Sequence, residues 1–143
     1  MDEKKYAILG EIVTIRATIG LVTDAEKIRV LVNSINYDHV AVIKDQFESP
    51  AGYISWAKIN EESLKRFVNN SLYPEYFYEW NEGDIVMITD IAAVHRYRFQ
   101  TLSKLKDLVR TFNCYTYKKG DRAPRLRNIR EEYCENEISG KHS

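Results

Sequence analysis

The chain has 143 residues, 44% of them hydrophobic and 29% charged, which suits one domain with its own core and is short for two. Its 21 basic residues balance its 21 acidic residues, so the net charge gives no hint of a partner. The mean hydropathy of −0.45 and the lack of a long uninterrupted apolar run exclude a membrane-spanning helix. From the polar opening segment and the two cysteines, Cys114 and Cys134, we expect neither a secretion signal nor a disulfide framework. We therefore expect a small soluble protein of the cytoplasm, with one domain over residues 1–130 and a polar tail over 131–143.

The first part of the chain predicts two helices followed by a hairpin. Apolar residues recur every three or four positions over Tyr6–Ile19, which is the spacing of an amphipathic helix. Asp24 is a candidate N-cap for a second helix, whose apolar stripe lies within Ile28–Ile35. The β-branched run His39–Lys44 predicts a strand, and Ala51–Ile59 predicts its antiparallel partner.

The rest of the chain predicts two more helices and three more strands. These are a helix over Glu61–Asn69 capped by Asn60, a strand over Ile85–Ala93, a helix over Thr101–Phe112, and strands over Cys114–Tyr117 and Arg125–Ile129. The third strand is apolar on both faces, which is typical of a central strand. The order of elements predicts an α+β fold, in which helices flank a mainly antiparallel sheet.

Positive charge is concentrated in residues 94–130. This segment holds eleven basic residues and two acidic ones, a balance of +9, whereas residues 1–93 hold nine basic and fifteen acidic ones, a balance of −6. Such a block either attracts an anionic partner or covers the outer faces of one helix and two strands, and the sequence leaves both open. Tyr115 and Tyr117 lie within it, but no RNA-binding motif accompanies them, so nucleic acid is not a predicted partner.

Asp90 is the acidic residue with the clearest chemical interest. It lies near the end of the predicted central strand, and alternation places it on the same face as Val86, Ile88 and Ala92. A carboxylate on a buried face loses hydration and must find hydrogen-bond donors or a cation. Such carboxylates are candidates for catalysis, and the alternative is a structural Asp that accepts backbone N–H bonds.

Motifs of several common enzyme classes are missing. The sequence has no phosphate-binding Gly-rich loop, no dinucleotide fingerprint, no HExxH and no CxxC. Its three histidines, His39, His95 and His142, are scattered, so no metal site is predicted.

Four short stretches resemble the toxin-activating lysine acyltransferases, the bacterial enzymes that mature RTX protoxins such as hemolysin. They are Ile8-Leu9-Gly10, then Gly52-Tyr53-Ile54-Ser55-Trp56-Ala57, Trp80-Asn81-Glu82-Gly83-Asp84, and Thr89-Asp90-Ile91-Ala92. Their order and spacing carry the resemblance over roughly residues 7–130.

The resemblance implies a GNAT-like fold and a protein-lysine N-acyltransferase. Members of this family move a fatty acyl group from acyl-acyl carrier protein to the ε-amine of internal lysines of an RTX protoxin, and they often form homodimers. The phosphopantetheine thioester is the donor, so no tightly bound cofactor is expected. The family relies on a histidine near the end of the first helical segment and on an aspartate that matches Asp90.

This sequence departs from the family pattern at the histidine. Residues 17–30 contain none, so the resemblance leaves either a divergent enzyme in which His95 substitutes, or a binding module that lost the chemistry. Arg96 and Arg98, close to the start of the predicted Thr101 helix, would suit the phosphopantetheine phosphate. The aromatic stretch Tyr73–Trp80 would either wall an acyl-chain channel or pack in the core or a dimer interface.

Overall fold

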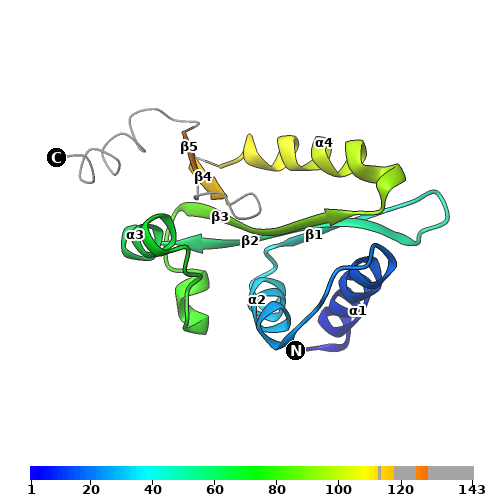
Figure 1. The fold of residues 1–143 in the computed structure, drawn as a ribbon, viewed down its shortest axis with the longest axis horizontal. Helices are drawn as coiled ribbons and strands as arrows, with labels where there is room; N and C mark the ends of the chain where they lie inside the picture. Colours follow the sequence, from blue (N-terminus) through cyan, green and yellow to red (C-terminus); the bar gives the residue numbers. More distant parts are fainter. Residues whose placement is uncertain (113, 118–124, 129–143) are drawn as a thin grey trace. The chain divides into compact units, whose positions relative to one another are not determined.

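A computed structural model describes residues 1–112, 114–117 and 125–128 (Figure 1). Its elements in chain order are α1 (Glu3–Thr18), α2 (Ala25–Asn36), β1 (Val40–Lys44), β2 (Pro50–Ile59), α3 (Glu61–Asn70), η1 (Phe77–Trp80), β3 (Ile85–Ala93), η2 (His95–Tyr97), α4 (Arg98–Val109), β4 (Cys114–Tyr117) and β5 (Arg125–Asn128). The predicted α+β class is confirmed. The predicted polar tail lies outside the described residues.

The described strands form one sheet in the order β1-β2-β3-β4-β5. β1 pairs with β2 antiparallel, with Val42 opposite Tyr53, and β4 pairs with β5 antiparallel. β3 and β4 are parallel, with Val86 opposite Tyr115. The sheet is therefore mainly antiparallel, as the sequence predicts.

The chain divides into two compact units, each of which we describe by itself. The first comprises Met1–Trp56 and Thr89–Lys106, and the second comprises Ala57–Ile88 and Asp107–Ser143. The single domain expected over residues 1–130 stays a prediction.

In the first unit, two helices cover one face of the strands. Ile12 and Ile15 of α1, Leu31 and Ile35 of α2, and Tyr53 of β2 form a fully buried cluster. Removing these side chains from water contributes about 1.5–3 kcal/mol for each large apolar residue. Figure 1 draws α1 and α2 on this face and the start of α4 on the opposite one.

Gly52 explains how α4 approaches the other face. Successive strand residues point to opposite faces, so Gly52 faces away from the cluster that holds Tyr53. A Cβ at Gly52 would lie 2.2 Å from Thr101 Oγ1, and Thr101 is the buried residue of α4. The helix packs this closely because position 52 carries no side chain.

Helix α4 begins earlier than predicted. It starts at Arg98, directly after η2, whereas the apolar spacing predicts a start at Thr101. Leu102, an apolar residue near the start of the predicted helix, is 45% exposed, and Phe99 is 87% exposed. The apolar pattern misled the prediction because the helix is anchored through Thr101, a polar residue, whose hydroxyl donates to the carbonyl of Tyr97 at 2.9 Å.

The two N-cap residues predicted from the sequence both form their capping hydrogen bonds. Asp24 accepts the backbone N–H of Lys27 at 2.8 Å, and Asn60 accepts that of Ser63 at 2.9 Å. Both caps satisfy backbone donors that the first turn of a helix leaves without intrahelical partners. Both predicted caps are confirmed.

The second unit contains α3, η1 and the first half of β3. Its buried side chains include Leu64, Phe67, Trp80, Ile85 and Met87. The predicted aromatic stretch divides here, because Trp80 is fully buried whereas its neighbours Tyr76, Phe77 and Tyr78 are about half exposed. Of the alternatives for this stretch, core packing therefore describes Trp80, at its end.

Candidate functional site

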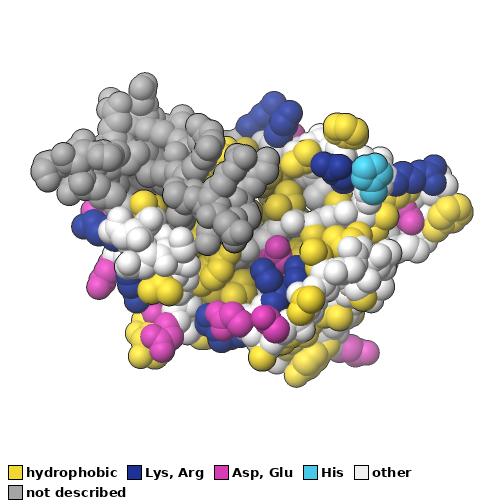
Figure 2. Space-filling view, in the orientation of Figure 1, with side chains coloured by type: hydrophobic (Ala, Val, Ile, Leu, Met, Phe, Trp, Pro, Cys, Tyr) yellow, Lys and Arg dark blue, Asp and Glu magenta, His cyan; other side chains and the backbone are white. Residues whose placement is uncertain are grey.

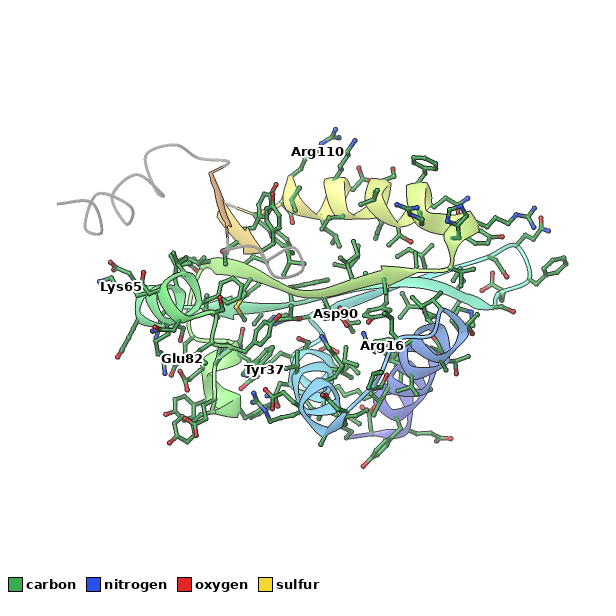
Figure 3. All side chains as sticks on the ribbon, viewed as in Figure 1. Arg16, Tyr37, Lys65, Glu82, Asp90 and Arg110 are labelled. Atoms are coloured by element: carbon green, nitrogen blue, oxygen red, sulfur yellow. The ribbon has the colours of Figure 1, made fainter. Side chains whose placement is uncertain are left out.

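Asp90 of β3 has the polar environment that a carboxylate on a buried face requires. Its side chain is 14% exposed. Oδ2 accepts from Arg16 Nη1 at 2.9 Å and from the Tyr53 hydroxyl, and Oδ1 accepts from the Ile91 N–H at 3.1 Å. Figure 3 shows Arg16 extending from α1 toward Asp90. The predicted need for a cation and for hydrogen-bond donors is confirmed.

Arg16 is nearly buried and fully engaged. Its side chain is 6% exposed. Besides Asp90, it donates from Nη1 to the Tyr53 hydroxyl at 2.9 Å, from Nε to Thr23 Oγ1 at 2.9 Å, and from Nη2 to the Val22 carbonyl at 2.6 Å. These bonds fix the segment that follows α1 as well as the carboxylate. The guanidinium therefore orients Asp90 and has its donors committed.

Tyr53 is a hydrogen-bond donor in this cluster. Burial first, and then the adjacent Asp90 carboxylate, raise the pKa of the Tyr53 phenol far above its usual value. The phenol stays protonated at neutral pH, so its hydroxyl donates to Asp90 while accepting from Arg16. Tyr53 thus positions the carboxylate and is unsuited to act as a base.

Lys27 is the accessible cation of the cluster. It lies in the first turn of α2, and its Nζ is 3.6 Å from Asp90 Oδ2. Its side chain is 25% exposed, four times the exposed fraction of Arg16. Asp90 therefore holds one buried cation and one that reaches solvent.

Two of the stretches that carry the family resemblance meet at this cluster. Tyr53 and Ser55 belong to the stretch in β2, and Thr89 and Asp90 belong to the stretch in β3. Ser55 Oγ and Thr89 Oγ1 are 2.7 Å apart and buried, and Tyr53 bonds Asp90. The residues that resemble the family are thus in direct contact although they are 34 and 37 positions apart.

The other predicted site residues lie at the start of α4. His95 and Arg96 are in η2, Arg98 opens α4, and all three are exposed. Figure 2 shows Lys or Arg atoms on either side of a histidine there. Among the described residues, neither a hydrogen bond nor an ion pair joins His95 to Asp90.

The remaining histidines do not replace the missing one. His39 is 7% exposed and its ring stacks between Tyr37 and Trp56, with centroids 5.9 and 6.0 Å away. His142 lies outside the described residues. Within the described part of the chain, no group of three His, Cys, Asp or Glu residues is placed to hold a metal.

Sequence reasoning missed Arg16, Tyr53 and Lys27. A signal for Arg16 was present, because it continues the helical spacing of Leu9 and Ile12 and so places a cation on the apolar face of α1. A buried cation requires an acidic partner. Nothing in the sequence indicated that this partner is Asp90, 74 residues away.

Comparison with known proteins identifies the family. The profile of the RTX toxin acyltransferase family matches residues 1–128. The chain belongs to this family. Its class of chemistry is accordingly acyl transfer, and RTX toxin activation is the role for which the family is named. No curated protein matches the chain.

One solved structure supports the fold assignment. A structure described as an acetyltransferase from Staphylococcus aureus Mu50 is 11% identical, covers 78% of this chain and 73% of its own, and has a TM-score of 0.50. A second acetyltransferase structure is 14% identical, covers 97% of this chain and 84% of its own, and has a TM-score of 0.40. The first likeness, together with the sheet order, confirms the GNAT-like fold.

None of the helices over the described residues has the length and apolar character needed to cross a membrane.

Proposed function

We propose that this chain transfers a fatty acyl group from acyl-acyl carrier protein to lysine ε-amines of an RTX protoxin, with Asp90 as the residue that receives the incoming lysine. The supporting observation is the Asp90 cluster. A carboxylate in the family stretch is oriented by Arg16 and Tyr53 and already attracts a lysine ammonium, that of Lys27. An acceptor lysine would present the same group to the same oxygen.

The reaction needs a neutral amine and a stabilised oxyanion. The ammonium must lose a proton before its nitrogen attacks the thioester carbonyl, and donors must stabilise the negative oxygen that forms. We assign Asp90 to holding the acceptor and keep His95, the exposed histidine five residues later, as the proposed proton acceptor. A His95→Gln variant should lose most of the rate of acyl transfer while it still binds the donor.

We assign Arg96 and Arg98 to the donor. Both are exposed cations at the start of α4, where the partial positive charge of the helix N-terminus adds to theirs. The phosphate of phosphopantetheine and the acidic surface of a carrier protein would be attracted to this position. Homodimer formation and a cytoplasmic location remain predictions of the resemblance and the composition.

Intact-mass measurement tests the function. The purified chain is incubated with dodecanoyl, tetradecanoyl or hexadecanoyl acyl carrier protein and an RTX protoxin segment that carries its acceptor lysines. We expect the segment to gain the mass of one acyl group, and the Asp90→Asn variant to be much slower. No mass gain with any chain length, although the donor binds, would instead favour the binding module that lost its chemistry.

A further inference from the structure

Lys27 occupies a distinctive position among the lysines of the first unit. It is the only lysine in the described part of that unit with an ion pair to Asp90, and a quarter of its side chain is exposed. In contrast, Lys5 Nζ donates to the Asn36 carbonyl at 2.9 Å, a bond that commits its nitrogen. Lys27 therefore combines access to solvent with proximity to the proposed catalytic carboxylate.

The ion pair places the Lys27 nitrogen near Asp90 without a direct hydrogen bond. A separation of 3.6 Å exceeds the 2.7–3.2 Å of a direct hydrogen bond, so charge attraction holds the ammonium near Asp90 without a fixed bond direction. The backbone of Lys27 is nevertheless fixed, because its N–H donates to the Asp24 cap. The side chain thus extends from a fixed backbone position and places its ammonium 3.6 Å from Asp90 Oδ2.

Resting on the proposed function, we propose that Lys27 is itself an acyl acceptor, so that the chain acylates its own Lys27 from the thioester donor. If a thioester docks where Asp90 receives an acceptor lysine, Lys27 Nζ is the nearest side-chain amine among the residues that the structure describes. Holding a nucleophile beside its target raises the rate of reaction far above that of a free amine in solution.

The step is balanced without a further reactant. The Lys27 ammonium loses one proton to solvent, and the neutral nitrogen attacks the thioester carbonyl carbon. The new C–N bond forms, the C–S bond breaks, and the departing pantetheine sulfur takes the second proton from nitrogen. The products are an amide and a thiol. The amide is neutral, so Asp90 keeps Arg16 and Tyr53 and loses its second cation.

Lys44 is a matched internal control. It belongs to the same unit and also forms an ion pair, with Nζ 3.5 Å from Glu11 Oε1, but its side chain is 41% exposed. Exposure alone would make Lys44 the more reactive lysine. Cleavage after glutamate yields a peptide over residues 27–48 that contains both lysines, so their acylation is compared by fragmentation within one molecule.

The experiment treats the whole chain with tetradecanoyl or hexadecanoyl acyl carrier protein, alone and with the protoxin segment. We expect acylation of Lys27 to exceed that of Lys44 by about ten-fold or more, because proximity favours Lys27. The excess should vanish in the Asp90→Asn variant and in chain unfolded by guanidinium. Lys27→Arg should remove the modification from this peptide and leave the low labelling of Lys44 as the only acylation in it.

Three results would overturn the proposal. Equal labelling, or more label on Lys44, would mean that exposure decides reactivity. An acylated protoxin segment beside an unmodified Lys27 would refute self-acylation and leave the proposed function intact. No acylation of either acceptor would refute the proposed function and self-acylation with it.

Discussion

Two nearly buried carboxylates, one in each unit, differ in where along the chain their hydrogen-bond donors lie. Glu79 in the second unit is 5% exposed, and it accepts from the Ser63 hydroxyl at 3.3 Å, from Arg66, and from the Tyr76 N–H at 3.1 Å. These donors lie within 16 residues of it along the chain. Asp90 draws its side-chain donors from residues at least 37 positions away.

Glu79 is thus a structural carboxylate held by donors close to it in sequence, whereas the partners of Asp90 are brought together by the fold. Glu79 closes a turn, because its oxygens accept from the Tyr76 N–H before η1 and from the side chains of Ser63 and Arg66 in α3. Asp90 joins α1, β2 and β3 in the first unit and keeps an accessible cation, Lys27. Burial alone is therefore a poor guide to function. The origin of the donors along the chain distinguishes the two, whereas an accessible cation does not, because Arg66 beside Glu79 is 41% exposed.

Replacing each carboxylate by its amide should separate the two roles most strongly. Asp90→Asn should lower the rate of acyl transfer by about 100-fold, because an amide cannot hold a lysine ammonium by charge. Glu79→Gln should leave the rate per folded molecule unchanged. Steady-state kinetics corrected for the folded fraction measures both. Equal losses in the two variants would contradict the distinction.

Two glycines, one in each unit, differ in what an added side chain would meet. A Cβ at Gly83 would lie 2.0 Å from the Ile59 carbonyl oxygen, so Gly83→Ala must displace backbone. A Cβ at Gly52 meets the side chain of Thr101 instead. We expect Gly83→Ala to lower the free energy of unfolding by about 3 kcal/mol and Gly52→Ala by about 1 kcal/mol.

Chemical denaturation of both variants checks this order. A Thr101→Ala background supplies the control, because it removes the oxygen that Gly52→Ala would meet. The cost of Gly52→Ala should shrink in that background, whereas the cost of Gly83→Ala should not change. An unchanged cost at Gly52 would show that Thr101 does not limit the approach of α4.

Acid should weaken the Glu79 contacts selectively. Burial raises the pKa of Glu79, but the Tyr76 N–H and Arg66 more than offset this, so the pKa falls below its ordinary value of 4.5. The carboxylate thus contributes its full stabilisation above pH 4.5, and loses it as the pH falls through the lowered pKa.

Glu79→Gln should therefore cost about 1–3 kcal/mol of unfolding free energy at pH 7. That difference from the wild type should diminish as the pH drops below 4.5. Glu82→Gln is the control, since Glu82 is exposed and accepts only from Asn60 among the described residues. A Glu79→Gln cost that is independent of pH would refute the role of the charge.

The smallest expected effect concerns the cations at the start of α4. The double variant Arg96→Gln, Arg98→Gln should raise the KM for acyl-acyl carrier protein by about 3–10-fold with little change in kcat. The increase should diminish at high salt, since exposed charges are screened. Lys104→Gln, an exposed cation further along the helix, should change neither parameter. Equal effects from Lys104 would indicate nonspecific attraction.

Much of the local structure was predictable because its causes are local. The caps Asp24 and Asn60 act on backbone groups three residues away, and the apolar run over β3 identified a central strand. The start of α4 was not predictable in this way. Its anchor, Thr101, is buried because Gly52 leaves room for it, and that contact is distant in sequence.

The same reasoning applies to the site. Alternation along β3 and the resemblance to a family were enough to select Asp90 and to require partners for it. The identity of those partners depended on how α1, α2 and β2 meet β3, which brings Arg16, Lys27 and Tyr53 to one carboxylate. Local patterns decide which residue must be satisfied, whereas tertiary packing decides which residues satisfy it, since hydrogen bonds and ion pairs depend on distance in space.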